Sequence, residues 1–402
     1  MIAPPVFPVR RREVIAAALE RLENRDWTRL EGEPETEAAL ATFHGLGIAG
    51  TTPEVWYISS GTAALESIML GYGIGSGDEI VVTPYTWGAT VSAILAIGAI
   101  PVFADVDPLT GLLDPVAAEA AITPATRAIM CVHLFGMPCD GTRLREIADR
   151  RGILLFEDGS QAHGARWRGT RVGAFGHAAA FSCMGMKLLA GTEGGYAMFH
   201  DPAAAERAYL YGKHPRGLHP ERATALGEAG LLDALQLGWR PCTVGAALVL
   251  AALPHLDGEV AARRRNAAVL RRHLDGFTAV TMSPEPEGAE GCWHLMSLVF
   301  HPERSGCDLE TYRTRLNELG VGTFRYIPVP IHRLKRLNPW DYDGPRVLWH
   351  DQLKRAGVDY RHTSCPHAEW RAEREFTMGF NWTEDDPAAM ARLAQALRDA
   401  LR

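Results

Sequence analysis

The chain has 402 residues, of which 47% are hydrophobic and 22% are charged, a composition typical of a globular protein with a sizeable core and room for two domains. Lys and Arg number 41 against 48 Asp and Glu, which gives a net charge of -7. This balance is not that of a basic nucleic-acid-binding protein or of a protein drawn to anionic membranes, and it favours a small-molecule partner.

The cysteines and the N-terminus predict a cytoplasmic protein. The seven cysteines form no Cys-x-x-Cys pair and leave one over, so we expect reduced thiols and no disulfides. No metal-ligand spacing such as His-Glu-x-x-His is present, so we expect no metal. Prolines stand where a signal peptide needs an apolar helix, and no apolar run approaches the ~20 residues of a membrane span.

The first half of the chain predicts a mainly parallel sheet. Residues 12–24 and 35–44 have helical spacing. From residue 54 onward, short β-rich runs alternate with helical segments; the predicted strands are 55–59, 79–84, 100–106, 127–134, 153–158 and 178–183. Repeated strand and helix units of this kind predict a sheet covered by helices on both faces.

The second half predicts a smaller α+β unit. A long helical stretch from Cys242 to Leu274 is apolar and then basic, which suggests a connector between units. Beyond it we expect strands at 278–283, 294–300 and 322–329, and helices at 309–319 and 386–402. The predicted division is an N-terminal arm (1–30), a large domain (31–255) and a small C-terminal domain (256–402).

Asp158 and Lys187 are the two candidate catalytic residues. Asp158 ends the apolar strand ILLFED, and the carboxyl ends of strands are where open α/β sheets bind ligands. The alternative for this aspartate is a helix N-cap. Lys187 stands among Met and Leu residues in FSCMGMKLLAGTEGG, where burial would favour its neutral, nucleophilic form. The alternative is a lysine that extends from a loop to solvent.

Two further strand ends carry residues that suit a phosphate and an aromatic ring. Ser60, Gly61 and Thr62 precede or open a helix, whose N-terminus attracts anions, although the same residues are common as simple caps. Trp87 in PYTWGAT could lie against a ring or be an ordinary packed Trp.

Together these features match the functional groups of pyridoxal phosphate: a phosphate, a flat ring, a pyridine nitrogen and an aldehyde. The sequence therefore predicts an enzyme that uses this cofactor.

Several long stretches also resemble the DegT/DnrJ/EryC1/StrS family of pyridoxal-phosphate sugar and cyclitol aminotransferases. They include SSGTAAL, GDEIVVTPYTWGATVSAILAIGAIPVFADVDP, EDGSQAHGA and FSCMGMKLLAGTEGG, and the likeness spans nearly the whole chain. The resemblance implies the pyridoxal-phosphate fold-type I, an α/β fold. It also implies that Lys187 bonds the cofactor as a Schiff base, that Asp158 faces the pyridinium nitrogen, that Gln161 flanks the ring and that Ser182 joins Gly61 and Thr62 at the phosphate.

The chain departs from the family pattern at two places. Members usually carry an Asn-aromatic-Arg motif that reaches the phosphate of the neighbouring subunit, and here the segment reads Gly238, Trp239, Arg240. Arg240 could still serve a partner subunit in the homodimer that the resemblance implies. In the EDGSQAHGA segment, Gly159 stands where an apolar residue or Cys is more usual, and Ser160 stands where Ala is more usual.

By this resemblance the chain moves an amino group from an amino acid, glutamine or glutamate, to a keto-cyclitol or keto-sugar in secondary-metabolite biosynthesis, with pyridoxamine phosphate formed midway. The likeness is to the branch that acts on scyllo-inosose. His163, Tyr326 and His332 are candidate substrate contacts. The alternatives within the fold are a nucleotide-sugar aminotransferase and a sugar dehydratase, although Lys187 favours transamination because related dehydratases typically have histidine there.

Two alternatives lie outside these enzymes. The glycine-rich GYGIGSGD suggests a nicotinamide dehydrogenase, but it follows a helix and precedes a strand, the reverse of the dinucleotide-binding order. The second alternative is a protein of this fold that serves in sensing or regulation and turns over no substrate.

Overall fold

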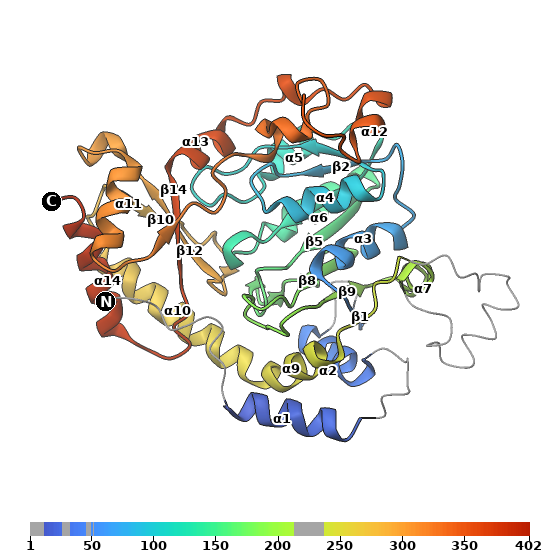
Figure 1. Ribbon diagram of the computed structural model, residues 1–402, viewed down its shortest axis with the longest axis horizontal. Helices are drawn as coiled ribbons and strands as arrows, with labels where there is room; N and C mark the ends of the chain where they lie inside the picture. The colour runs from blue at the N-terminus through green and yellow to red at the C-terminus, as the bar shows by residue number, and fades with distance from the viewer. Residues whose placement is uncertain (1–11, 26–32, 46–49, 51, 213–236) are drawn as a thin grey trace, which may run out of the picture.

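The computed structural model describes residues 12–25, 33–45, 50, 52–212 and 237–402, and the account below concerns these residues (Figure 1). A seven-stranded sheet forms the centre of the molecule. Its strands are β1 (Glu54–Ile58), β2 (Glu79–Val82), β3 (Ile100–Phe103), β4 (Thr126–Val132), β5 (Leu154–Asp158), β8 (Ala178–Ser182) and β9 (Gly195–Phe199). They lie in the order β1-β9-β8-β5-β4-β2-β3. Only β9 runs antiparallel to its neighbours within this sheet.

Helices cover both faces of this sheet because both faces are apolar. Along β1, Trp56 and Ile58 belong to the core under one face, whereas Val55 and Tyr57 belong to the core under the other. The first core is closed by α3 (Gly61–Gly71), α4 (Gly88–Ala96), α5 (Pro115–Ala120), α6 (Gly141–Arg151) and α7 (Pro202–Gly212). The second is closed by α2 (Pro34–His44), α9 (Thr243–Ala252) and the start of α10 (Leu256–His273), and α1 (Arg12–Glu23) packs on α9.

A second, antiparallel sheet holds the C-terminal part of the chain. It consists of β10 (Val280–Met282), β12 (Leu295–Phe300), β13 (Thr323–Phe324) and β14 (Glu375–Gly379), in the order β10-β12-β14-β13. The helices α11 (Leu309–Glu318) and α14 (Pro387–Asp399) lie at this end of the molecule with α10 (Figure 1). A small sheet joins β11 (Ala289–Glu290) to β6 (Arg166–Trp167) and β7 (Thr170–Arg171).

The segment between β13 and β14 returns to the large sheet instead of staying with the second one. It contains α12 (His350–Arg355) and α13 (Pro366–Arg374), which lie beside the edge formed by β3 and β2 (Figure 1). Tyr360 donates a hydrogen bond to the carbonyl of Pro101 (2.8 Å), and Gln352 donates one to that of Ala99 (3.1 Å). The C-terminal part of the chain therefore contributes to the rim of the large sheet.

The predicted strands and helices of the first half are confirmed, and several features differ; β6, β7 and α7 were not predicted. The strands β9 and β14 were not predicted, because β9 directly follows a Glu-Gly-Gly turn and β14 directly follows α13. A 3-10 turn at Leu253–His255, which contains Pro254, interrupts the long helical stretch. Of the predicted strand 322–329, only Thr323–Phe324 pairs. The predicted domain boundaries stay predictions, and the N-terminal arm lies partly outside the described residues.

One helical stretch differs from the expectation about membranes. Thr243–His273, 31 residues with a mean hydropathy of 1.3 over its most apolar part, is long and apolar enough to cross a membrane by length and composition. The interior helix of a globular protein meets the same criterion, and Ala246 and Val249 of this stretch are fully buried against the sheet. The stretch is therefore weak support for a membrane span.

Candidate active site

A cavity of about 220 Å³ lies at the carboxyl ends of the parallel strands. Its walls bring together eight of the residues predicted from the sequence: Ser60, Gly61, Thr62, Trp87, Asp158, Gln161, Ser182 and Lys187. These residues come from four loops that follow different strands, so the sheet topology places them at one edge.

Asp158 is fixed in the cavity wall by two donors. It ends β5 and is only 5% exposed. Its Oδ2 accepts a hydrogen bond from Thr90 Oγ1 (2.8 Å), and its Oδ1 accepts one from the Ser160 amide (3.1 Å). Both bonds set the direction of the carboxylate. Thr90, which itself contacts Thr86 Oγ1 at 3.1 Å, was not predicted as a site residue.

Lys187 lies in the same cavity, half-buried, in the loop that follows β8. The loop is shaped by backbone hydrogen bonds, including one from the Lys187 amide to the Met184 carbonyl (2.8 Å). Burial lowers the pKa of the Lys187 amine, and the Asp158 carboxylate and Cys183 oppose that shift. The amine therefore loses its proton more readily than an exposed lysine does, as a nucleophile or base requires.

The first turn of α3 borders the cavity and is packed closely against β8. Ser60 caps the helix by accepting a hydrogen bond from the Ala63 amide (3.1 Å). A Cβ atom on Gly61 would lie 2.6 Å from the Cβ of Ser182, so only glycine fits at this position without a shift. A helix N-terminus leaves backbone N–H groups without partners in the helix, which suits a phosphate at this wall.

Gln161 and Tyr326 connect the large sheet to the C-terminal part of the chain. Gln161 accepts a hydrogen bond from the Phe135 amide (2.7 Å) and donates one to the Tyr326 hydroxyl (2.7 Å). Burial raises the pKa of Tyr326, and the Asp158 carboxylate adds to that shift. The Tyr326 ring lies 5.6 Å from the ring of Trp87, which is 58% exposed at the mouth of the cavity.

His133, which lines the cavity, forms a buried pair with Glu157 that was not predicted as part of the site. Successive residues of a strand point to opposite faces, so Glu157 faces away from Asp158. It accepts hydrogen bonds from the amides of Gly173, Phe175 and Gly176 (2.7–2.9 Å), and its Oε2 lies 3.1 Å from His133 Nε2. The pair anchors the end of β5 to residues 173–176.

The ligand atoms of His133, Cys131 and Cys139 lie within 4.8 Å of one another, close enough to consider a metal ion. However, His133 Nδ1 accepts the Cys139 amide hydrogen (3.0 Å) and Nε2 faces Glu157. Because both ring nitrogens are used, this cluster carries no metal proposal.

Four predicted residues do not line the cavity, and one of them, Tyr326, is linked to it through its hydrogen bond from Gln161. His163 is fully buried against Phe181 and Tyr196, and neither of its ring nitrogens has a hydrogen-bond partner within the described ranges. His332 is also buried, and its Nε2 contacts Glu369 Oε1 at 2.9 Å. Arg240 is exposed outside this cavity. The predicted substrate contacts of His163 and His332 therefore find no support in the position of their side chains.

The departures at Gly159 and Gly238 each have a local explanation. A Cβ atom on Gly159 would lie 2.4 Å from the ring of Phe181, so this ring takes the space of a larger residue. Gly238 has a φ of 68°, a conformation that Gly and Asn adopt most readily. The backbone at Gly238 thus suits the residue that the family usually has there.

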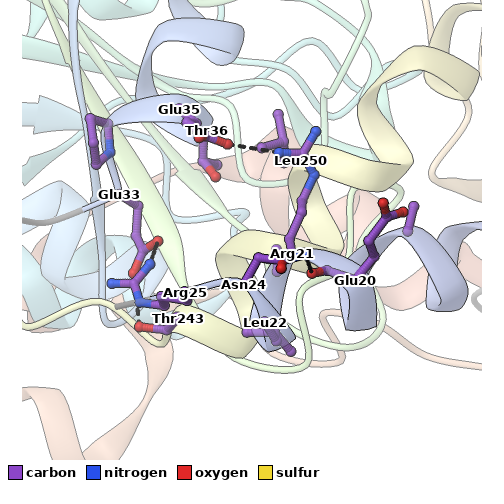
Figure 2. Close-up of a pocket in the computed structure, with 13 residues that line it drawn as sticks. Glu20, Arg21, Leu22, Asn24, Arg25, Glu33, Glu35, Thr36, Thr243 and Leu250 are labelled. Carbon is purple, nitrogen blue, oxygen red and sulfur yellow. Dashed lines mark hydrogen bonds and ion pairs between the residues drawn. The ribbon is translucent and has the colours of Figure 1, made fainter. Parts of the chain in front are cut away.

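A larger cavity of about 680 Å³ lies between α1, α2 and α9, away from these residues (Figure 2). Four of its charged side chains pair with one another, Arg21 with Glu35 (2.7 Å) and Arg25 with Glu33 (2.8 Å), and Thr243 donates a hydrogen bond to Glu33 (2.8 Å). The described residues that line this cavity include no lysine and none of the groups assembled around Asp158. The smaller cavity is therefore the candidate active site.

Comparisons with known proteins show which family the chain resembles. Residues 9–345 match the DegT/DnrJ/EryC1/StrS aminotransferase family. The L-glutamine:2-deoxy-scyllo-inosose aminotransferase of Streptomyces kanamyceticus is 44% identical over 218 residues, 53% of this chain and 50% of that protein. The chain thus aligns with about half the length of that relative.

Two further proteins match over more of their length. The dTDP-3-amino-3,4,6-trideoxy-alpha-D-glucose transaminase of Streptomyces venezuelae is 36% identical over 308 residues, 75% of this chain and 74% of that protein. The crystal structure of S. venezuelae DesV in complex with a ketimine intermediate has a TM-score of 0.79 and 29% identity, and the match covers 97% of this chain and 94% of that one.

Proposed function

Because the chain belongs to the DegT/DnrJ/EryC1/StrS aminotransferase family, we propose that it transfers an amino group from an amino acid to a ketone on a cyclitol or sugar ring, with pyridoxal phosphate bonded to Lys187. The observation that carries the proposal is that a half-buried lysine shares one cavity with a fixed carboxylate and a helix N-terminus. The chain has only four lysines, and the two others described, Lys335 and Lys354, are exposed.

The chemistry of the cavity walls fits this cofactor. An amine suits an aldehyde, a carboxylate suits a pyridine nitrogen, and the N-terminus of α3 suits a phosphate. When bound, pyridoxal phosphate supplies an electron sink that acidifies the α-proton of an amino acid. The site residues would hold it by Lys187 at one end, by Asp158 at the ring nitrogen and by Ser60, Gly61, Thr62 and Ser182 at the phosphate.

The residues of this chain then have separate tasks. Once the amino donor has displaced it from the cofactor, the Lys187 amine, with its pKa lowered by burial, would remove the proton from the α-carbon of the donor and later return a proton as a general acid. Asp158, held by Thr90 and the Ser160 amide, keeps a proton on the ring nitrogen. Gln161 and Tyr326 fix the side of the cavity nearest the C-terminal part of the chain, and Trp87 borders the opening.

The relatives support the choice of substrates. Glutamine as donor and a keto-cyclitol as acceptor follow from the inosose aminotransferase, and a nucleotide-linked keto-sugar is the alternative acceptor supported by the sugar transaminase. We also propose a cytoplasmic homodimer in which Arg240, exposed in one subunit, reaches the phosphate of the other.

The test is a direct assay of amino transfer. Purified protein is supplied with pyridoxal phosphate, L-glutamine and either 2-deoxy-scyllo-inosose or a dTDP-linked keto-sugar, and products are identified by mass spectrometry. We expect the amine of one ketone together with the keto acid of glutamine. Loss of water from the sugar without amino transfer would indicate the dehydratase instead. Cofactor binding with no turnover of either ketone would refute the proposed reaction.

A further inference from the structure

A buried group of polar side chains behind the opening of the cavity has no part in the chemistry described above. Arg371 of α13 is fully buried, as is Tyr85, and Glu375 at the start of β14 is 1% exposed. We call these three residues, with Ser283 and Ser297, the Arg371 cluster. A charge removed from water must be matched by hydrogen bonds or an opposite charge, so such a cluster holds its partners firmly in place.

Arg371 connects segments that are far apart in the sequence. Its Nη1 donates to the carbonyls of residues 108–109 (2.9 and 2.6 Å), which follow β3 of the large sheet. Its Nη2 donates to Ser283 Oγ (2.8 Å) and Ser297 Oγ (2.7 Å) on the side of the second sheet. The guanidinium also lies over the ring of Tyr85, 5.6 Å from its centroid. One side chain thus ties both sheets together.

The space beside the Arg371 side chain is filled, so a residue larger than glycine does not fit at position 111. A Cβ atom on Gly111, where φ is 74°, would lie 2.7 Å from Arg371 Nε. The N-terminus of α13 is held as well, because the Asp105 carboxylate accepts hydrogen bonds from the amides of His367 and Ala368 (2.9 Å each). The N-terminus and the middle of α13 are therefore attached to the segment that follows β3.

Glu375 completes the cluster with its opposite charge. Its Oε1 accepts hydrogen bonds from Ser297 Oγ (3.1 Å) and from the Thr377 hydroxyl. Burial raises the pKa of the Glu375 carboxyl, and the Arg371 guanidinium opposes that shift most strongly. Ser297 thus bonds both charged groups and joins them across the second sheet.

The cluster is linked through the backbone to the two aromatic side chains at the opening. Tyr85 stands two residues before Trp87, and Arg325 stands immediately before Tyr326. Arg325 donates to the carbonyl of Ala372 in α13. The two segments thus present Trp87 and Tyr326 to the opening, with ring centroids 5.6 Å apart, and attach to α13 from behind.

We propose that the Arg371 cluster is a positioning device that holds Trp87 and Tyr326 at a fixed separation and so determines which ring ketones enter the site. This inference rests on the proposed function for its substrate class. Arg371 acts through the two aromatic residues and touches no substrate. Loosening the cluster lets the two walls move, which weakens acceptor binding more than it slows proton transfer at Lys187.

The experiment compares Arg371→Lys with the milder Ser283→Ala, which removes one hydroxyl acceptor and keeps the buried charge. Hydrogen exchange followed by mass spectrometry reports on residues 84–88 and 324–327. We expect faster exchange in both segments. With L-glutamine and 2-deoxy-scyllo-inosose, we expect the KM for the ketone to rise about fivefold to thirtyfold while kcat changes little.

Arg263→Lys is the matched control, since Arg263 is also buried (3% exposed) and donates to the carbonyls of Trp293 and Phe380. It should lower the melting temperature without altering exchange at 84–88 and 324–327. The proposal is overturned if folded Arg371→Lys and Ser283→Ala proteins exchange like the wild type, or if the control gives the same changes. A wild-type protein that binds cofactor but aminates no ketone would refute the proposed function, while the exchange comparison would still decide the positioning role.

Discussion

Thr90 offers the sharpest test of how the carboxylate of Asp158 is held. Its hydroxyl donates a hydrogen bond of 2.8 Å to Oδ2 of a carboxylate that is only 5% exposed. A hydrogen bond to a charged group contributes about 1.5–3 kcal/mol. Because each 1.36 kcal/mol changes a rate about tenfold, Thr90→Val should slow the reaction with the amino donor by about 10- to 150-fold.

The assay is a single-turnover reaction with L-glutamine, followed by the loss of the near-visible absorbance of the lysine-bound cofactor. Thr90→Ser keeps the hydroxyl and should stay within a few-fold of wild type, by the same hydrogen-bond reasoning. Ser92→Ala is the matched control on α4, because the Ser92 hydroxyl donates to the Ala89 carbonyl (3.2 Å) and not to Asp158. If folded Thr90→Val reacts at the wild-type rate, this hydrogen bond does not support the action of Asp158.

Two further predictions concern packing and pH. Gly61→Ala should weaken cofactor binding tenfold or more in an absorbance titration, because its new Cβ would meet Ser182 at 2.6 Å; Gly88→Ala, with nothing within 4 Å, should bind normally. Burial lowers the pKa of His163 to about 3, with help from the nearby Lys187 charge. The unfolded chain then binds more protons between pH ~6.5 and that value, so stability falls as the pH drops through this window. We measure the free energy of unfolding in urea for His163→Phe and for wild type at pH 7.5 and pH 5. The free energy of unfolding of the variant minus that of wild type should increase by about 2 kcal/mol from pH 7.5 to pH 5. An equal difference at both pH values would contradict the burial of a neutral histidine.

Much of the fold follows from the sequence because its signals are local. Alternating strand and helix patterns predict the large sheet, and the family resemblance and the fold class, an α/β fold of pyridoxal-phosphate fold-type I, are confirmed by the comparisons. Asp158 and Lys187 meet in one cavity because each lies at or just after the end of a strand in that sheet. Parallel topology brings such positions together whatever their separation in the chain.

The residues that the sequence did not reveal act across long separations. Thr90 follows Trp87 by one helical turn, which is a usable signal once the helix start is known. The partnership of Gln161 with Tyr326 joins residues 165 positions apart, and no periodicity predicts it. His332, a plausible pocket residue from its neighbours in the sequence, turns toward Glu369 because the segment after β13 returns to the large sheet.

The most direct test of the whole account is the chemical identity of the group that holds the cofactor. Protein saturated with pyridoxal phosphate is reduced with borohydride and digested, and the peptides are mapped by mass spectrometry. The account predicts the added mass on the peptide that contains Lys187. Modification of any of the other three lysines instead, or of none, would contradict it.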